Sequence, residues 1–197
     1  MGANRAAAFP PFPTLTTERL LLREITPDDA PFWLRNFSDP DVVELTAYEP
    51  PRDLEAAKEE IEQYCTRVFR EEAGIRWGIT LKGRGDLIGT LGYHAWVQER
   101  DRRARMGYDL LAEYRRKGIM TEAMEAVLAY GFKTMTLNRV EALVDPRNLP
   151  SIRLVERLGF HRDAYLRQST RFRDRFYDDV VFSLLSREWR ATRSGKG

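Results

Sequence analysis

Residues 113–123 read "EYRRKGIMTEA" and place three consecutive basic side chains directly before Gly118 and a predicted helix. The amino end of a helix carries a partial positive charge, so added cations are unfavourable there unless an anion is bound. Gly118 can adopt backbone dihedrals that other residues avoid, and it lets the backbone approach a ligand closely. The unpaired amides at the helix start would converge on an oxyanion such as a pyrophosphate. The stretch therefore predicts an anion-binding turn. Taken alone, it leaves a solvated basic loop open as the alternative.

The residues on both sides of this turn follow strand and helix periodicities in alternation. The predicted strands comprise residues 18–26, a hairpin over 76–97, and residues 103–111, 139–144, 160–172 and 175–186. The predicted helices comprise residues 27–37, 52–72, 119–130 and 150–158. This order predicts an α/β fold in which one mixed, mostly antiparallel central sheet is flanked by about four helices and contains one right-handed crossover.

Length and composition indicate one globular domain. We expect a flexible arm at residues 1–16, a folded domain at 17–188 and a basic tail at 189–197. The net charge of +2 gives no general attraction to nucleic acid. Apolar runs are too short to span a membrane, and the first residues lack the apolar core of a secretory signal. Together with a single cysteine, these features predict a cytoplasmic protein without an internal disulfide.

A second motif begins 30 residues after Gly118. Residues 148–160, "NLPSIRLVERLGF", follow the pattern Asn-x-x-Ser-x-x-Leu-x-Glu-x-x-Gly-Phe, and residues 115–120 match Arg-x-x-Gly-x-Gly/Ala except at Met120. With "TERLLLREIT" at residues 17–26, these motifs mean that the chain resembles the GNAT superfamily of acyl-CoA-dependent N-acyltransferases. Within it, the chain is similar to the branch that contains the ribosomal-protein N-terminal acetyltransferases. The resemblance extends over about residues 17–188 and implies a single GNAT-like domain.

The resemblance implies that acetyl-CoA is the co-substrate and that no metal takes part. The strand that ends at residue 111 would bind the pantetheine arm through its backbone as if it were another strand. An N–H near Leu110 or Leu111 would polarise the thioester carbonyl. The residues implied to contact the coenzyme are Tyr108, Leu110, Leu111, Arg115, Arg116, Lys117, Gly118, Ile119, Met120, Thr121, Asn148 and Ser151.

The implied reaction is acetyl transfer to a primary amine without a covalent enzyme intermediate. An ammonium group has no lone pair, so a carboxylate, directly or through water, should take a proton. Glu141 and Asp163 are the candidate bases, and a salt-bridged structural role is the alternative for each. Ser151 is a candidate to assist the leaving thiolate, or else a hydroxyl that satisfies a backbone donor at its helix start. For His94, a packing or hydrogen-bonding role is favoured over a place in the acceptor cleft.

The acceptor is expected to bind between the early helices and the closing hairpin, with Phe37, Glu44, Tyr48 and Tyr165 as wall residues. A protein N-terminal amine suits the branch, and polyamines, aminoglycosides and other small amines stay open. The alternative function is a non-catalytic acyl-CoA-binding module. Binding of nucleic acid is supported only by the arginine-rich end of the chain. The habits of the branch and the long edge strands of the closing hairpin also predict a homodimer.

Overall fold

One eight-stranded sheet organises the chain, with the strand order β1-β2-β3-β4-β5-β6-β8-β7. The computed structural model describes residues 11–98 and 100–194, with only the backbone for residues 192–194. All neighbouring strands are antiparallel except β5 and β6, which are parallel. The strands are β1 (Leu15–Thr16), β2 (Leu20–Glu24), β3 (Ile75–Leu81), β4 (Leu87–Val97), β5 (Arg103–Leu110), β6 (Arg139–Val144), β7 (His161–Phe172) and β8 (Arg175–Leu185).

The helices begin where local signals favour them. The carboxylates of Asp39 and Asp53 and the amide oxygen of Asn148 accept hydrogen bonds from backbone amides at three helix starts. The helical segments are η1 (Pro27–Asp29), α1 (Ala30–Phe37), α2 (Pro40–Thr46), α3 (Leu54–Ile61), the π-helical η2 (Glu62–Arg67), α4 (Val68–Arg70), η3 (Ala112–Tyr114), α5 (Ile119–Lys133), α6 (Leu149–Arg157) and α7 (Ser186–Ser194).

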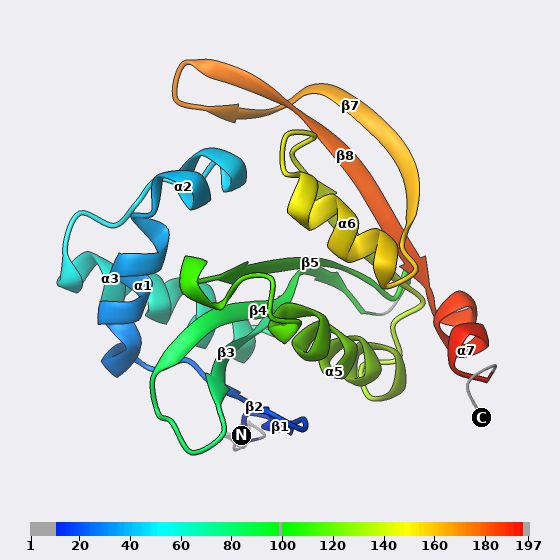
Figure 1. The fold of residues 1–197 in the computed structure, drawn as a ribbon, viewed down its shortest axis with the longest axis horizontal. Helices are drawn as coiled ribbons and strands as arrows, with labels where there is room; N and C mark the ends of the chain where they lie inside the picture. The colour runs from blue at the N-terminus through cyan, green and yellow to red at the C-terminus, as the bar shows by residue number, and fades with distance from the viewer. Residues whose placement is uncertain (1–10, 99, 195–197) are drawn as a thin grey trace, which may run out of the picture.

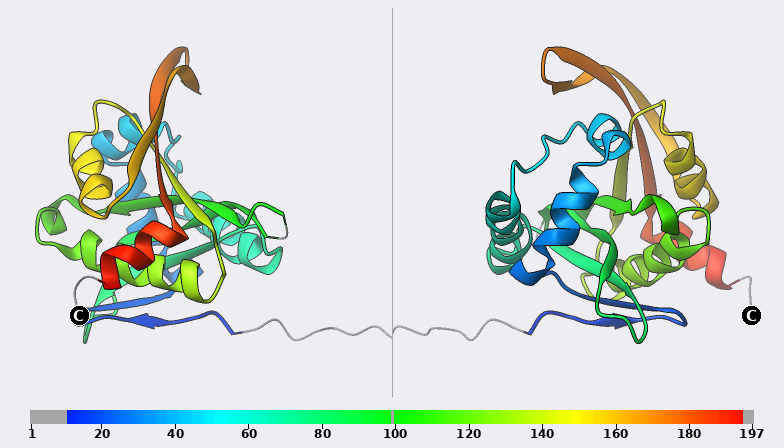
Figure 2. Two further views of the ribbon diagram at one scale, coloured as in Figure 1. Left: turned by 90° about the vertical axis from the view of Figure 1, so that its right-hand side faces the viewer. Right: turned by 60° about the vertical axis from the view of Figure 1, so that its left-hand side comes forward.

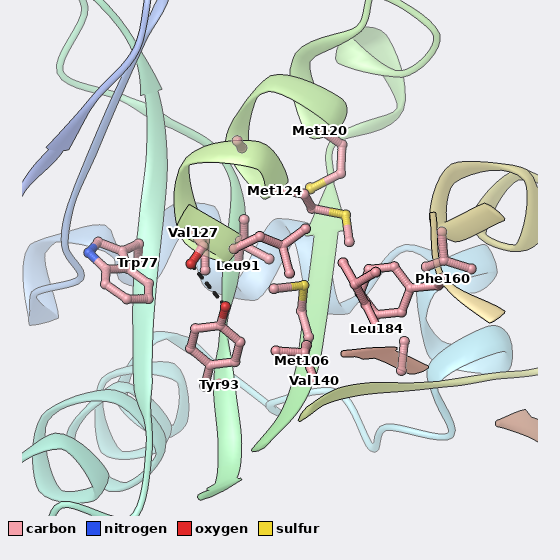
Figure 3. Close-up of a cluster of buried hydrophobic side chains, with 14 of the residues drawn as sticks. Trp77, Leu91, Tyr93, Met106, Met120, Met124, Val127, Val140, Phe160 and Leu184 are labelled. Atoms are coloured by element: carbon pink, nitrogen blue, oxygen red, sulfur yellow. Dashed lines mark hydrogen bonds between the residues drawn. The ribbon is translucent and has the colours of Figure 1, made fainter. Parts of the chain in front are cut away.

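Two apolar clusters cover opposite faces of the sheet. The larger one packs α5 and α6 against the strands, and the smaller one packs α1 and α3 near the ends of β4 and β5. Figure 3 shows part of the larger cluster, where the Tyr93 hydroxyl on β4 donates to the Val127 carbonyl of α5 at 2.9 Å. This bond satisfies a polar group inside the core and fixes α5 above β4.

The β7–β8 hairpin projects beyond the body of the sheet, and its tip bends towards α2 (Figures 1 and 2). Two ion pairs join these distant parts of the chain. Arg173 in the hairpin turn contacts Glu49 at 3.1 Å, and Arg147, which precedes α6, contacts Glu44 of α2 at 2.8 Å. The hairpin, α2 and the start of α6 therefore surround the same end of β5.

The structure confirms the α/β class and the mixed, mostly antiparallel sheet, but it contains two helices that the patterns do not predict. α2 starts at the Asp39 cap and is too short to show an apolar stripe. α7 places the buried Trp189 against Phe132, with ring centroids 5.3 Å apart. The predicted domain boundary at residue 188 falls inside α7.

The predicted arm is only partly within the described residues, since residues 1–10 lie outside them. The Phe12 ring packs on Trp77 at 5.8 Å between centroids, and Trp77 Nε1 donates to the Pro13 carbonyl at 2.6 Å. Leu15 and Thr16 pair with β2 as β1. Residues 12–16 are therefore packed against the sheet.

Candidate functional site

β5 and β6 separate soon after they begin. Their parallel pairing joins residues 103–105 to residues 139–141 and ends there, among the residues that the structure describes. β5 continues to Leu110 and β6 to Val144. Backbone groups along the two diverging edges can hydrogen-bond an extended ligand in the way that an added strand would.

The register of β5 decides which of its amides face this opening. The Leu111 N–H donates to the Ile88 carbonyl at 3.0 Å, so it points towards β4. Because groups alternate along an antiparallel pair, the N–H and C=O of Leu110 and of Tyr108 point the other way, towards β6. Of the two amides that the resemblance implies for the thioester carbonyl, only that of Leu110 faces the opening.

The turn before α5 leaves helix-start amides available. Gly118 has φ +76° and is the N-cap residue of α5, and no side chain caps this helix. The first helical hydrogen bond runs from the Glu122 N–H to the Gly118 carbonyl at 3.1 Å. The N–H groups of residues 119–121 therefore have no partner within the helix and can bind an anion.

The three cations of the turn have different surroundings. Arg115 donates to the Leu110 carbonyl at 3.0 Å and lies 3.6 Å from Asp39 and 3.7 Å from Asp41. These contacts tie the turn to β5 and to the start of α2. Arg116 and Lys117 are exposed, so they are the two cations of this turn that can face an incoming phosphate.

Glu122 anchors the first turn of α5 to the start of β2. It accepts from the Thr17 hydroxyl at 2.5 Å, the Arg19 N–H at 2.8 Å and the Arg19 Nε at 2.6 Å. Burial by itself would raise the pKa of Glu122, but the hydrogen bonds from Thr17 and Arg19 outweigh it and lower the pKa. The ionised carboxylate is therefore part of what holds the turn in place.

Replacing Glu122 by Gln should lower Tm at neutral pH, and the difference from wild type should narrow in acid. A carboxyl whose pKa is lowered by folding stabilises the protein above its unfolded pKa of about 4.3, and this contribution is lost as pH falls through the folded pKa. Thermal melts from pH 7 to pH 3 measure the effect, with Glu125→Gln on the exposed face of α5 as control. A difference that does not change with pH would contradict this role of the charge.

The start of α6 faces β5 across the opening. Asn148 Oδ1 accepts from the Ser151 N–H at 3.2 Å, and the Ser151 hydroxyl pairs with the Tyr108 hydroxyl at 2.5 Å. Burial raises the pKa of Tyr108 to about 12, although the hydrogen bond with Ser151 acts in the opposite direction. Asn148, Ser151 and Tyr108 thus form one hydrogen-bonded group between α6 and β5, and Tyr108 keeps its proton at neutral pH.

Both candidate carboxylates contact the same arginine. Arg139 donates to Glu141 at 2.8 Å and to Asp163 at 2.6 Å. Asp163 also accepts from the Ser183 hydroxyl at 2.7 Å, and Arg105 lies 3.6 Å from Glu141. Burial would raise the pKa of Asp163, but Ser183 and Arg139 lower it overall, which makes this carboxylate a weak base.

The four residues that we expect to line the acceptor site mostly pack against other side chains or form hydrogen bonds and ion pairs with them. Phe37 is buried, with its ring 4.8 Å from that of Tyr48, and the Tyr48 hydroxyl donates to Glu60 at 2.5 Å. Glu44 pairs with Arg147, and the exposed Tyr165 donates to Asp178 at 2.6 Å.

A buried polar network lies on the other face of β5, and the sequence analysis does not identify it. Asp109 accepts from Arg76 at 2.9 Å, from Thr90 at 2.5 Å and from Asn36 at 2.8 Å. The only sequence signal is an acidic residue inside the otherwise apolar "GYDLL". The network joins α1, β3 and β4 to β5, and β5 is the strand that borders the opening.

Two kinds of feature are absent from the part of the chain that the structure describes. No group of three or more His, Cys, Asp or Glu side chains is arranged to hold a metal ion in residues 11–98 and 100–194. Within the same residues, no helix is both long and apolar enough to cross a membrane.

Comparison with known proteins identifies the class as acetyltransferases. The family described as acetyltransferase (GNAT) domain matches residues 19–161. YoaA of Bacillus subtilis, an uncharacterised N-acetyltransferase, is 37% identical over 174 residues, which cover 88% of this chain and 97% of the relative. The chain therefore belongs to the GNAT family.

Two further proteins place this membership in context. The ribosomal protein uS5-alanine N-acetyltransferase of Escherichia coli is 24% identical over 188 residues, covering 89% of this chain and 92% of the relative. The structure of Mycobacterium smegmatis RimJ in complex with CoA-disulfide has a TM-score of 0.78 at 23% identity, covering 93% of this chain and 95% of that one. At this identity, the similarity to RimJ shows a shared fold alone.

Proposed function

We propose that this protein transfers an acetyl group from acetyl-CoA to a primary amine, with a protein N-terminal amine as the favoured acceptor. The observation that carries the proposal is the open edge of β5, which leads to the uncapped start of α5 behind Gly118. An extended arm with a diphosphate at its end fits this combination, because the strand edge binds the arm and the helix start binds the charge.

The residues present fit the coenzyme. The amides of residues 119–121 and the exposed Arg116 and Lys117 would hold its phosphates, and a Cβ added to Gly118 would meet only Arg19 Nη2, at 3.4 Å. When bound, acetyl-CoA supplies the activated acyl group. The Leu110 N–H can stabilise negative charge that develops on the acyl oxygen, because it already faces the opening. Binding both substrates in one opening also supplies proximity and orientation.

Of the two carboxylates, Glu141 is the one that we propose assists the reaction. It is the last residue of β6 that pairs with β5, so it stands where the opening begins. Its negative charge favours the approach of an ammonium group at this point. Asp163 lies on β7 and is held by Ser183 and Arg139, so its role is to position Arg139 and through it Glu141.

We also propose that the hydroxyl pair of Tyr108 and Ser151 hydrogen-bonds the sulfur end of the coenzyme. The two oxygens lie 2.5 Å apart between β5 and α6, beside the opening. The raised pKa of Tyr108 means that this pair presents a neutral hydroxyl rather than a phenolate, and a neutral hydroxyl can donate to a thiolate.

Two considerations favour a protein N-terminal amine. Its pKa of about 7.7–8.0 leaves a useful fraction neutral at physiological pH, whereas a lysine amine near 10.4 is almost entirely charged. The relative from Escherichia coli is named as an alanine N-acetyltransferase of ribosomal protein uS5.

The deciding experiment is an acetyl-CoA turnover assay, read as thiol release, with N-terminal peptides, polyamines and aminoglycosides as acceptors. We expect release with N-terminal peptides at the lowest KM. Coenzyme binding without release on any amine would instead show a non-catalytic acyl-CoA-binding module.

Glu141→Gln should lower kcat/KM at least tenfold, because a carboxylate that attracts an ammonium at close range contributes one or more kcal/mol. Calorimetry should show unchanged coenzyme A affinity. Asp163→Asn serves as the comparison and should have the smaller effect. The reverse order of the two variants would assign the assisting carboxylate to Asp163.

We also propose that the chain forms a homodimer through β7. This strand is the edge of the sheet and carries the exposed side chains of Tyr165 and Leu166. An unpaired edge with apolar side chains favours association. A monomer in sedimentation at micromolar concentration would contradict the dimer.

A further inference from the structure

His94 lies against the backbone of β5 beside the point where β5 and β6 separate. It pairs across strands with Arg105, the last β5 residue that pairs with β6. A Cβ placed on Gly107 would lie 3.4 Å from His94 Cε1 and 3.6 Å from His94 Nδ1. Because Gly107 has no side chain, the imidazole reaches the β5 backbone at the start of the opening.

A cavity of about 510 Å³ adjoins the imidazole. Its lining includes His94, Trp96, Arg105 and Glu141, together with residues at the start of α4 and just beyond its end. Glu141 faces this side of the sheet because its neighbours Val140 and Ala142 belong to the core on the other side. The cavity thus contains the carboxylate at the opening, on the same face of the sheet as the paired His94 and Arg105.

The charges around His94 keep its ring neutral. Surrounding protein partly desolvates the exposed imidazole, and Arg76 of β3 and Arg105 of β5 add positive charge, so the pKa of His94 lies below its usual value. Arg103 and Glu141 are the other charged groups on the cavity wall. In contrast, both candidate carboxylates already accept hydrogen bonds from Arg139, which engages their oxygens.

We propose that His94 takes the proton that the acceptor nitrogen releases during acetyl transfer, and that the cavity beside it holds the acceptor next to its amine. This inference rests on the proposed acetyltransferase function. Glu141 then acts through its charge, attracting the ammonium and offsetting the imidazolium, while His94 touches the reacting nitrogen.

The step balances without any other reactant. The neutral amine forms an N–C bond to the acetyl carbon, the C–S bond breaks, and the sulfur leaves as a thiolate. The extra proton on the former amine nitrogen passes to the free imidazole nitrogen of His94. Once bonded to the acyl carbon, this nitrogen is far more acidic than the free ammonium, so a weak base suffices. The imidazolium, close to two arginines, then gives its proton to solvent.

The test is His94→Gln, which keeps a hydrogen-bonding side chain but cannot take the proton. We expect kcat with an N-terminal peptide to fall about 10²-fold, in the usual range for loss of a general base, with unchanged coenzyme A affinity by calorimetry. The wild-type kcat should fall as the pH drops towards about 4, where His94 becomes protonated because its pKa is lowered to about 4, and the variant should lack this acid limb. His161→Gln is the matched control, because the chain has only two histidines and His161 is exposed on β7.

His94→Asn is the second variant, and circular dichroism checks that both variants fold. Wild-type kcat and an unchanged acid limb in either folded variant would overturn the role of His94 while leaving acetyl transfer in place. Failure of the wild-type protein to release thiol with any amine would overturn both proposals. A higher KM with unchanged kcat would mean that His94 only contacts the acceptor. This result would contradict proton transfer to His94.

Discussion

Gly118→Asp should reduce the affinity for coenzyme A about 10³-fold while leaving the fold intact. Gly118 is the N-cap residue of α5, and an aspartate there adds a negative charge beside the unpaired amides that follow. The introduced carboxylate would compete with the coenzyme phosphates for these N–H groups. It would also repel the diphosphate, and like charges brought together in this way cost several kcal/mol. A loss of about 10³-fold corresponds to about 4 kcal/mol of binding free energy.

Gly83→Asp is the matched control for this experiment. Gly83 lies in the β3–β4 turn with φ +77°, close to the +76° of Gly118, and nothing lies within 4 Å of an added Cβ. Both substitutions therefore impose the same left-handed strain and add the same charge, but only one acts at the helix start. Isothermal calorimetry with coenzyme A measures the difference. Equal affinities for the two variants would show that the diphosphate binds elsewhere.

The turn before α5 could be predicted from sequence because it depends on backbone geometry that one residue type supplies. Gly118 has a left-handed conformation, which the sequence analysis expects of a glycine at this turn. The strand and helix order was predictable for a similar reason, since periodicity reports which face of each element is buried. These features are local, so a short stretch of sequence contains them.

Features that depend on contacts between distant segments could not be predicted in this way. Arg115 belongs to the Arg-x-x-Gly motif, yet its guanidinium contacts the Leu110 carbonyl and lies near Asp39, 76 positions earlier in the chain. α7 has a strongly charged sequence, and only its packing against Phe132 shows that Trp189 belongs to the core. His94 likewise gains its position from Gly107, whose missing side chain has meaning only in the folded sheet.

The Asp109 network is the least predictable part of the site and should have the largest effect on stability. Asp109 is 8% exposed, and it binds Arg76, Thr90 and Asn36 from three other elements. Asp109→Ala would leave the Arg76 guanidinium, whose side chain is 22% exposed, without its counter-charge. Removing one partner of a buried ion pair costs about 3–5 kcal/mol, so Tm should fall by roughly 10 °C.

The double variant Arg76→Met with Asp109→Ala separates the cost of an unpaired charge from the value of the pair. If the uncompensated charge dominates, the double variant should be more stable than Asp109→Ala alone, because no buried charge remains. Asp86→Ala, at an exposed position before β4, should change the free energy of unfolding by less than about 0.5 kcal/mol. Chemical denaturation of these three variants and of Arg76→Met alone gives the four values that the comparison needs. Additive losses in the double variant would mean that Arg76 and Asp109 contribute independently, and that packing rather than this pair holds β5 in place.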